Sequence, residues 1–157
     1  MNSDGTNQTK ITNLKQHSRT SSWSGDGKKI IFTSATNDNK NHADIYEINI
    51  DGTNLKQITN TKDEDERTVI YLSDENSIMF DSNTQSGQDS IYTMNLDGTS
   101  KVKISTVSGS WGPALSPDKN YFVYSLSGKL LIADKAGKTV KELPVESYDV
   151  GSPSWGK

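Results

Sequence analysis

Short apolar stretches recur along the chain, alternating with polar residues and bounded by Gly, Asp, Asn or Pro. No longer window carries apolar residues at the i, i+3, i+4 and i+7 positions that mark an amphipathic helix. Alternation with a period of two, rich in β-branched side chains, is typical of half-buried strands. The pattern therefore predicts an all-β chain, with its clearest strands at residues 28–34, 43–50, 76–82, 90–96 and 121–127.

The strands belong to a repeat. The triplet Asp-Gly-Thr begins at Asp4, Asp51 and Asp97, at spacings of 47 and 46 residues. Each copy follows a strand and precedes a shorter one, and Asp-Gly supplies the positive φ values of a tight hairpin turn. A second landmark keeps the same period, beginning at Trp23, Leu72 and Leu115.

Four short strands at this period match one blade of a β-propeller. A single blade cannot bury both of its faces, so blades must stack. The sequence predicts an all-β β-propeller of about three four-stranded blades, half of a six-bladed ring, in one domain over residues 1–157. The blades are expected at residues 21–59, 68–105 and 112–143, with end strands at 7–12 and 152–156. The first strands are expected to line the axis near Trp23, Leu72 and Leu115.

The motifs resemble the TolB-like propeller repeats. The first unit carries Trp-Ser-Gly-Asp-Gly from Trp23, Asp-Ile-Tyr from Asp44 and Asp-Gly-Thr from Asp51, whereas the middle unit departs from the pattern and lacks its proline. The resemblance implies a protein-binding propeller that works in the periplasm or outside the cell. It also implies that the last residues complete a blade opened at the N-terminus, so the strand count predicts a chain shortened at its front. The Lys-, Asn- and Ile-rich composition indicates a bacterial source.

Composition excludes several kinds of site. The chain has no cysteine, two histidines and a net charge of −3, which argues against thiolate chemistry, a three-histidine zinc site and a broad phosphate-binding surface. No apolar run is long enough to span a membrane. Nucleophile-elbow, zincin and P-loop motifs are absent. We therefore expect no catalytic residue, metal, cofactor, nucleic-acid partner or membrane insertion, and we expect His17 and His42 to be solvated loop residues.

Positions that recur in every blade serve the blade, so partner binding is expected where blades differ. The variable connections are residues 13–20, 35–42, 60–67, 83–88, 105–111 and 145–151. The most distinctive is the acidic run in 60–67, read as a loop that is either merely solvated, a surface for a partner, or a carboxylate site for calcium. Trp111 is the best aromatic anchor candidate. The predicted partner-binding residues are Asp63, Glu64, Asp65, Glu66, Arg67 and Trp111.

Three functions fit these observations. The leading one is a non-catalytic scaffold for protein–protein interaction; the alternatives are the propeller portion of a larger hydrolase or lyase, and a structural module of a cell-surface protein. The gene sequence ahead of Met1 discriminates among them.

Packing between blades is expected for the repeat aromatics Trp23, Trp155, Tyr46 and Tyr92. Three blades also leave two outer faces, so a homodimer that closes the ring is predicted, with the end segments pressed onto the seams. The exposed rows are expected to be Ile30, Phe32 and Ile45 at one end and Phe122, Tyr124 and Leu131 at the other.

Overall fold

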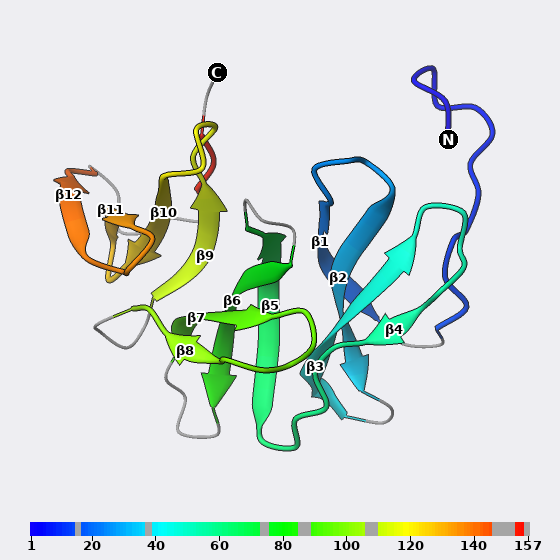
Figure 1. The fold of residues 1–157 in the computed structure, drawn as a ribbon, viewed down its shortest axis with the longest axis horizontal. Helices are drawn as coiled ribbons and strands as arrows, with labels where there is room; N and C mark the ends of the chain where they lie inside the picture. Colours follow the sequence, from blue (N-terminus) through cyan, green and yellow to red (C-terminus); the bar gives the residue numbers. More distant parts are fainter. Residues whose placement is uncertain are drawn as a thin grey trace.

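The computed structural model describes residues 1–14, 17–36, 39–72, 76–84, 89–105, 110–145 and 153–155. Over these ranges the chain forms three antiparallel four-stranded sheets and no helix. Within each sheet the strands follow chain order, and the three sheets stand side by side from the N-terminal to the C-terminal one (Figure 1). The all-β prediction and the three four-stranded blades are confirmed.

Blade one contains β1 (Ser18–Trp23), β2 (Lys29–Thr36), β3 (Asn39–Asn49) and β4 (Lys56–Gln57). Blade two contains β5 (Glu64–Tyr71), β6 (Ser77–Thr84), β7 (Asp89–Asn95) and β8 (Val102–Lys103). Blade three contains β9 (Ser110–Leu115), β10 (Tyr121–Leu126), β11 (Lys129–Asp134) and β12 (Thr139–Leu143). The first strand of each blade begins earlier than the pattern predicted. Residues 7–12 and 153–155, expected as end strands, carry no strand.

Two apolar cores join the blades. In the first junction, Ile31 and Ile45 of blade one pack against a row of blade two: Val69, Tyr71, Ile78, Phe80 and Met94. In the second junction, Met79 and Ile91 of blade two pack against Phe122, Tyr124, Leu131 and Ala133 of blade three. The expectation that Ile45, Phe122, Tyr124 and Leu131 face outward is therefore wrong. Successive strand residues point to opposite faces, and the sequence pattern does not say which face meets a neighbour.

The two outer faces are partly covered by the end segments. On blade one, Ile11 and Leu14 pack against the buried Phe32, and the N-terminal segment runs along the side away from blade two (Figure 1). On blade three, residues 153–155 border a recess formed by β10 and β11, where Trp155 Nε1 donates a hydrogen bond to the carbonyl of Ala114 at 2.9 Å. Only part of each outer face thus remains open.

The aromatic positions of the repeat divide into two groups. Tyr92 stacks on Phe80 in the first junction, at 5.8 Å between ring centroids, which confirms its packing between blades. Tyr46 stacks on Phe32 at the same distance, but on the outer face of blade one beneath Ile11 and Leu14, so its expected packing between blades is wrong. Trp23 is 62% exposed, so its expected burial between blades is also wrong. Its side of blade one has no preceding blade in this chain.

The Asp-Gly-Thr turns join the third and fourth strands as predicted. In blade one, the Asp51 carboxylate accepts hydrogen bonds from the Thr53 amide and hydroxyl at 2.9 and 2.7 Å, and Gly52 has a φ of +86°. These hydrogen bonds lower the pKa of Asp51. The turns after third strands and the turns after first strands lie at one end of the sheets, here called the turn face. The connections between second and third strands lie at the opposite end, the loop face.

Candidate functional site: the polar cluster of the first junction

The acidic run predicted as a loop lies mostly within a strand. β5 begins at Glu64, so Glu64, Asp65, Glu66 and Arg67 are strand residues, and only Asp63 precedes the strand. Asp65 is 9% exposed and Glu66 is fully buried. The expectation of a solvated loop is wrong for these residues because their pairing with β6 extends to the loop face, where Glu64 lies opposite Thr84.

A β-bulge sets the direction of these side chains. Between Glu66 and Val69, two residues of β5 lie opposite Asp81 alone. The amide of Thr68, freed from the regular ladder, donates instead to the Asp81 carboxylate at 2.9 Å. Because a bulge shifts the alternation of faces, Glu66 and Val69 share the face that meets blade one.

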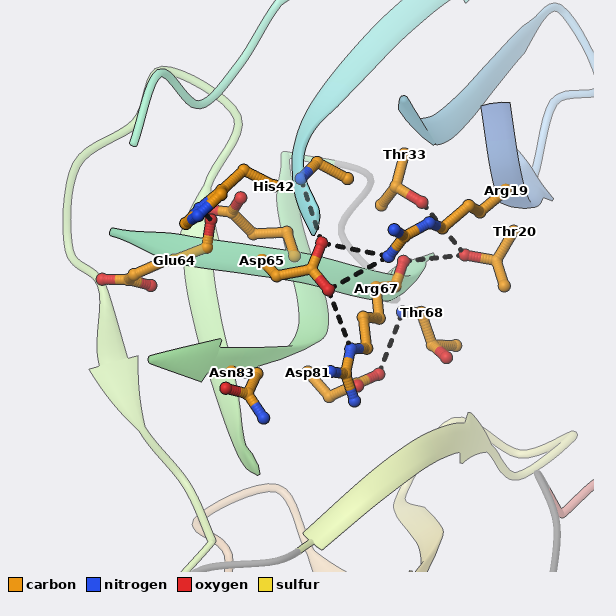
Figure 2. Close-up of polar contacts among 12 residues, drawn as sticks. Arg19, Thr20, Thr33, His42, Glu64, Asp65, Arg67, Thr68, Asp81 and Asn83 are labelled. Carbon is orange, nitrogen blue, oxygen red and sulfur yellow. Dashed lines mark hydrogen bonds and ion pairs between the residues drawn. The ribbon is translucent and has the colours of Figure 1, made fainter. Parts of the chain in front are cut away.

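Asp65 gathers the two arginines of the chain (Figure 2). Arg19 of β1 contacts both carboxylate oxygens at 3.0 and 3.1 Å, and Arg67 Nε donates to one of them at 3.1 Å. The amide of Ala43 in β3 completes the set at 3.0 Å. Arg67 also reaches Asp89 of β7 at 3.0 Å. One buried carboxylate thus ties two strands of blade one to blade two through charge-assisted hydrogen bonds.

Glu66 lies in a second, drier group. Its two carboxyl oxygens lie 3.1 and 3.2 Å from the hydroxyl of Thr61, and Asp44 accepts a hydrogen bond from the Thr61 amide at 3.0 Å. Burial and the nearby charge of Asp44 raise the pKa of Glu66 to about 8, and burial also raises the pKa of Asp44. The Thr61 hydroxyl donates to the Glu66 carboxyl, and a pKa of about 8 means that this carboxyl is mostly protonated at pH 7.

Glu64 and Asp81 complete the cluster on blade two. Glu64 accepts a hydrogen bond from Ser82 at 2.9 Å and forms an ion pair with Lys101. The Lys101 ammonium also lies 4.6 Å from the centre of the Tyr92 ring, a cation–π distance. Burial raises the pKa of Asp81 to about 6, against the hydrogen bonds that Thr68 donates.

The other predicted site residues lie apart from this cluster or outside the described part. Asp63 is exposed just before β5. The backbone of Trp111 lies in β9, opposite Ser125, whereas its side chain is outside the described residues. His17 is exposed as expected, but His42 is a strand residue of β3, with Nδ1 3.3 Å from the Glu64 carbonyl. In the described ranges no three His, Asp or Glu side chains are arranged to hold a metal ion, and no helix is long and apolar enough to cross a membrane.

The cluster joins the two blades through buried polar groups and has a polar, partly exposed rim. Its buried carboxylates are engaged by guanidinium, hydroxyl and amide donors from the neighbouring blade. The side chains of Arg19 and Arg67 nevertheless keep 35% and 40% of their surface accessible, and Asp65 fixes both. The cluster therefore presents two oriented cations toward the loop face, the face on which the exposed Asp63 precedes β5.

Sequence reasoning missed Arg19, Asp44, Thr61, Asp81 and Asp89. One signal in the sequence was available: the arginines hold the same place in the repeat, 48 residues apart. Each lies in the bulge of its blade, since the register also shifts between Ser18 and Ser21. Polar contacts between residues so distant in sequence leave no other mark on the local pattern.

Comparison with known proteins supports the same architecture. The TolB beta propeller domain family matches residues 1–157. No curated protein sequence matches the chain significantly. Among solved structures, a putative TolB from Agrobacterium tumefaciens is 24% identical, with a TM-score of 0.65 over 83% of this chain. TolB from Acinetobacter baumannii is 20% identical, with a TM-score of 0.51 over 87%. Dipeptidyl peptidase 4 from Porphyromonas gingivalis is 11% identical, with a TM-score of 0.58 over 85%.

These likenesses concern the fold. The chain spans 50% and 45% of the two TolB structures and 25% of the peptidase. The family match, by contrast, extends over every residue and agrees with the repeat motifs, the turn geometry and the three blades. The chain belongs to the TolB β-propeller domain family.

Proposed function

We propose that this chain is a non-catalytic propeller scaffold that binds a protein partner on its loop face, at the rim of the first junction. The observation that carries the proposal is the pair of arginines fixed by Asp65, each partly exposed, toward the end of the sheet where the exposed Asp63 precedes β5. Arginine is enriched among residues that dominate binding energy. Side chains that are already ordered lose less conformational entropy on association.

The buried and exposed members of the acidic run take different roles in this proposal. Asp65 and Glu66 hold the rim in place from within, whereas Asp63, Glu64 and Arg67 are available to touch a partner. Trp111 stays a predicted contact from the neighbouring blade. The TolB relationship supports a location outside the cytoplasm, which we propose as well.

The experiment compares variants in quantitative affinity capture from an extract of the source cells. Asp63→Ala combined with Arg67→Ala should reduce recovery of a specific partner at least tenfold. Asp97→Ala, in a turn on the opposite face, is the control and should leave recovery unchanged. Equal losses from both sets at equal thermal stability, or no specific partner with the wild type, would contradict the proposal.

The alternative is the propeller portion of a larger hydrolase. Its support is the likeness to the dipeptidyl peptidase, which at 11% identity concerns the fold alone. A gene that encodes a hydrolase domain contiguous with this chain would favour this alternative over a stand-alone scaffold.

A further inference from the structure

The second junction contains a recess on the turn face. The first junction has a wider recess at the equivalent place, of about 470 Å³, but polar and charged side chains such as Lys29, Glu47 and Lys56 line it. The recess of the second junction has a volume of about 240 Å³, and its floor is apolar, formed by Leu72, Met79, Leu115 and Phe122. Met79 and Phe122 are each 1% exposed. Ser77 and Thr93 line one side, and two lysines, Lys119 and Lys135, line the other. A pocket of this size suits a ligand smaller than most drug molecules.

The register of the strands identifies the same place in the first junction. Ile31 lies opposite Glu47 in blade one, as Met79 lies opposite Thr93 in blade two. Glu47 and Thr93 therefore hold equivalent positions. The same register makes Lys29 equivalent to Ser77, since these residues lie opposite Asn49 and Asn95. On the facing blades, Tyr71 is equivalent to Leu115, because they lie opposite Ile78 and Phe122.

In the first junction this place is occupied by a carboxylate of the protein itself. Glu47 is 8% exposed and accepts a hydrogen bond from the Tyr71 hydroxyl at 2.9 Å. Its other oxygen accepts one from Lys29 Nζ at 3.1 Å. The position thus accommodates a carboxylate between two blades when cationic and hydroxyl donors surround it.

In the second junction the carboxylate is missing and cations remain. Thr93 replaces Glu47, and Leu115 replaces Tyr71, so the recess here is lined by a neutral and an apolar side chain in their place. Lys135 lies across the recess. It holds the position that Leu96 holds in the blade before, because Asp134 and Asn95, which precede these two residues, are equivalent in the strand register. The partly buried Leu96 packs against the first core, so an apolar residue in one junction is a lysine in the other.

We propose that this recess binds a small monocarboxylate with a short apolar stem. The carboxylate lies between the ammonium groups of Lys119 and Lys135, and the stem lies on the apolar floor. The exposed lysines give the carboxylate charge-assisted partners without full desolvation of its charge, and the buried floor takes the apolar stem out of water. The site is separate from the loop-face rim, so it does not depend on the proposed scaffold function.

Titration with hexanoate, followed by two-dimensional NMR, tests the proposal. Hexanoate should shift the amide signals of Ser77, Thr93, Lys119 and Lys135 saturably. Hexanamide has the same shape without the charge, and acetate has the charge without the stem; each should bind at least tenfold more weakly. No saturable shift with hexanoate, or equal affinity for hexanamide, would overturn the proposal.

Two kinds of variant locate the site. Lys119→Met combined with Lys135→Met should weaken hexanoate binding at least tenfold, whereas Lys138→Met, in the same turn as Lys135, should leave it unchanged. Thr93→Glu places a carboxylate where Glu47 lies in the first junction and should also block binding; Thr93→Gln is its uncharged control. Unchanged affinity in the double lysine variant, at an unchanged melting temperature, refutes the assignment.

Discussion

Replacing Glu66 by glutamine should make the protein more stable at alkaline pH. The Glu66 carboxyl is fully buried, and its pKa rises from 4.5 to about 8 in the folded chain. Between these two pH values the unfolded chain releases the proton while the folded chain keeps it, so wild-type stability falls as pH rises through this window. Glutamine has nearly the same shape, cannot ionise, and its amide oxygen can accept the hydrogen bond that Thr61 donates to Glu66.

The magnitude follows from the width of the window. One pH unit corresponds to about 1.4 kcal/mol for a single group, so the titration of Glu66 lowers the free energy of unfolding by up to roughly 5 kcal/mol between pH 4.5 and 8. Small domains have a total stability of about 5–15 kcal/mol, so the effect is large. Asp81 acts in the same direction between its ordinary value of 3.8 and about 6. Above pH 6 the Asp81 contribution is complete, so the further loss that we test there is that of Glu66.

Urea denaturation at pH 5, 6, 7, 8 and 8.5 measures this contribution. We expect the wild type to lose stability throughout, and Glu66→Gln to be nearly flat above pH 6 and more stable than wild type by about 3–5 kcal/mol at pH 8.5. Glu64→Gln, on the same strand, is the control: it removes the ion pair with Lys101 but leaves Glu66 to titrate, so the wild-type slope should persist. A Glu66→Gln protein with the wild-type slope above pH 6 refutes the reasoning.

Three further predictions concern the junctions and the ends. Gly137→Ala should cost about 2–4 kcal/mol, because its Cβ would meet the carbonyl of Ile104 and lie 2.7 Å from the Ile104 Cγ2 at a positive φ. Gly27→Ala has a similar φ but open space, and denaturation should show a loss of only about 1 kcal/mol. Trp155→Ala should cost about 1–3 kcal/mol by uncovering the outer face of blade three, while Trp23→Ala, at a largely exposed side chain, should change stability by under about 1 kcal/mol in the same assay. The homodimer that closes a ring predicts a mass near twice 17.3 kDa by light scattering at micromolar concentration; the mass of one chain in a folded sample contradicts it.

Much of the fold was predictable because its determinants are local. Each Asp-Gly-Thr turn satisfies its own polar groups within five residues, as the hydrogen bonds from Asn49 to Thr53 and from Asn95 to Thr99 show. Such turns fix the strand period whatever lies around them. Stacking then follows from the apolar faces, which no single blade can bury.

The alignment of the middle blade was wrong by one residue for a local reason. In blades one and three, a serine hydroxyl accepts a hydrogen bond from the backbone amide of the residue five positions later. The pairs are Ser24 with Lys29 and Ser116 with Tyr121. The backbone contact at the same place in blade two joins Leu72 to Ser77. Leu72 thus replaces the turn serine, and Tyr71, not Leu72, is the counterpart of Trp23. The sequence pattern aligned Ser73 with Ser24 and Ser116, which shifted the predicted register of the middle blade by one residue.

The acidic run was misplaced because charge alone suggests solvent. A run of six consecutive charged residues, Lys62 to Arg67, is usually exposed, and the sequence around Glu64 gives no sign of a bulge. The residues around Asp65 and Glu66 come from far away in the chain. Arg19 and Ala43 contact Asp65, and Asp44 lies near Glu66. Long-range pairs of this kind become visible only when the blades are placed side by side.

Because the blades share one backbone register, each serves as an internal control for the others. Glu47 and Thr93 occupy the same position on equivalent strands, so the difference between the carboxylate-lined recess of the first junction and the apolar-floored recess of the second is a difference of side chains and not of fold. Likewise Ser18 and Glu66 hold equivalent places, opposite Ser34 and Ser82, yet only Glu66 is buried, because only it faces a preceding blade in this chain. When a polar residue differs from the residues at the equivalent positions of the other blades, the difference has two possible reasons. The residue either pairs with a neighbour in the protein or can contact a ligand. In the first junction the neighbours are present and account for Glu66, whereas in the second Lys119 and Lys135 line a recess in which the position of Glu47 is held by a threonine.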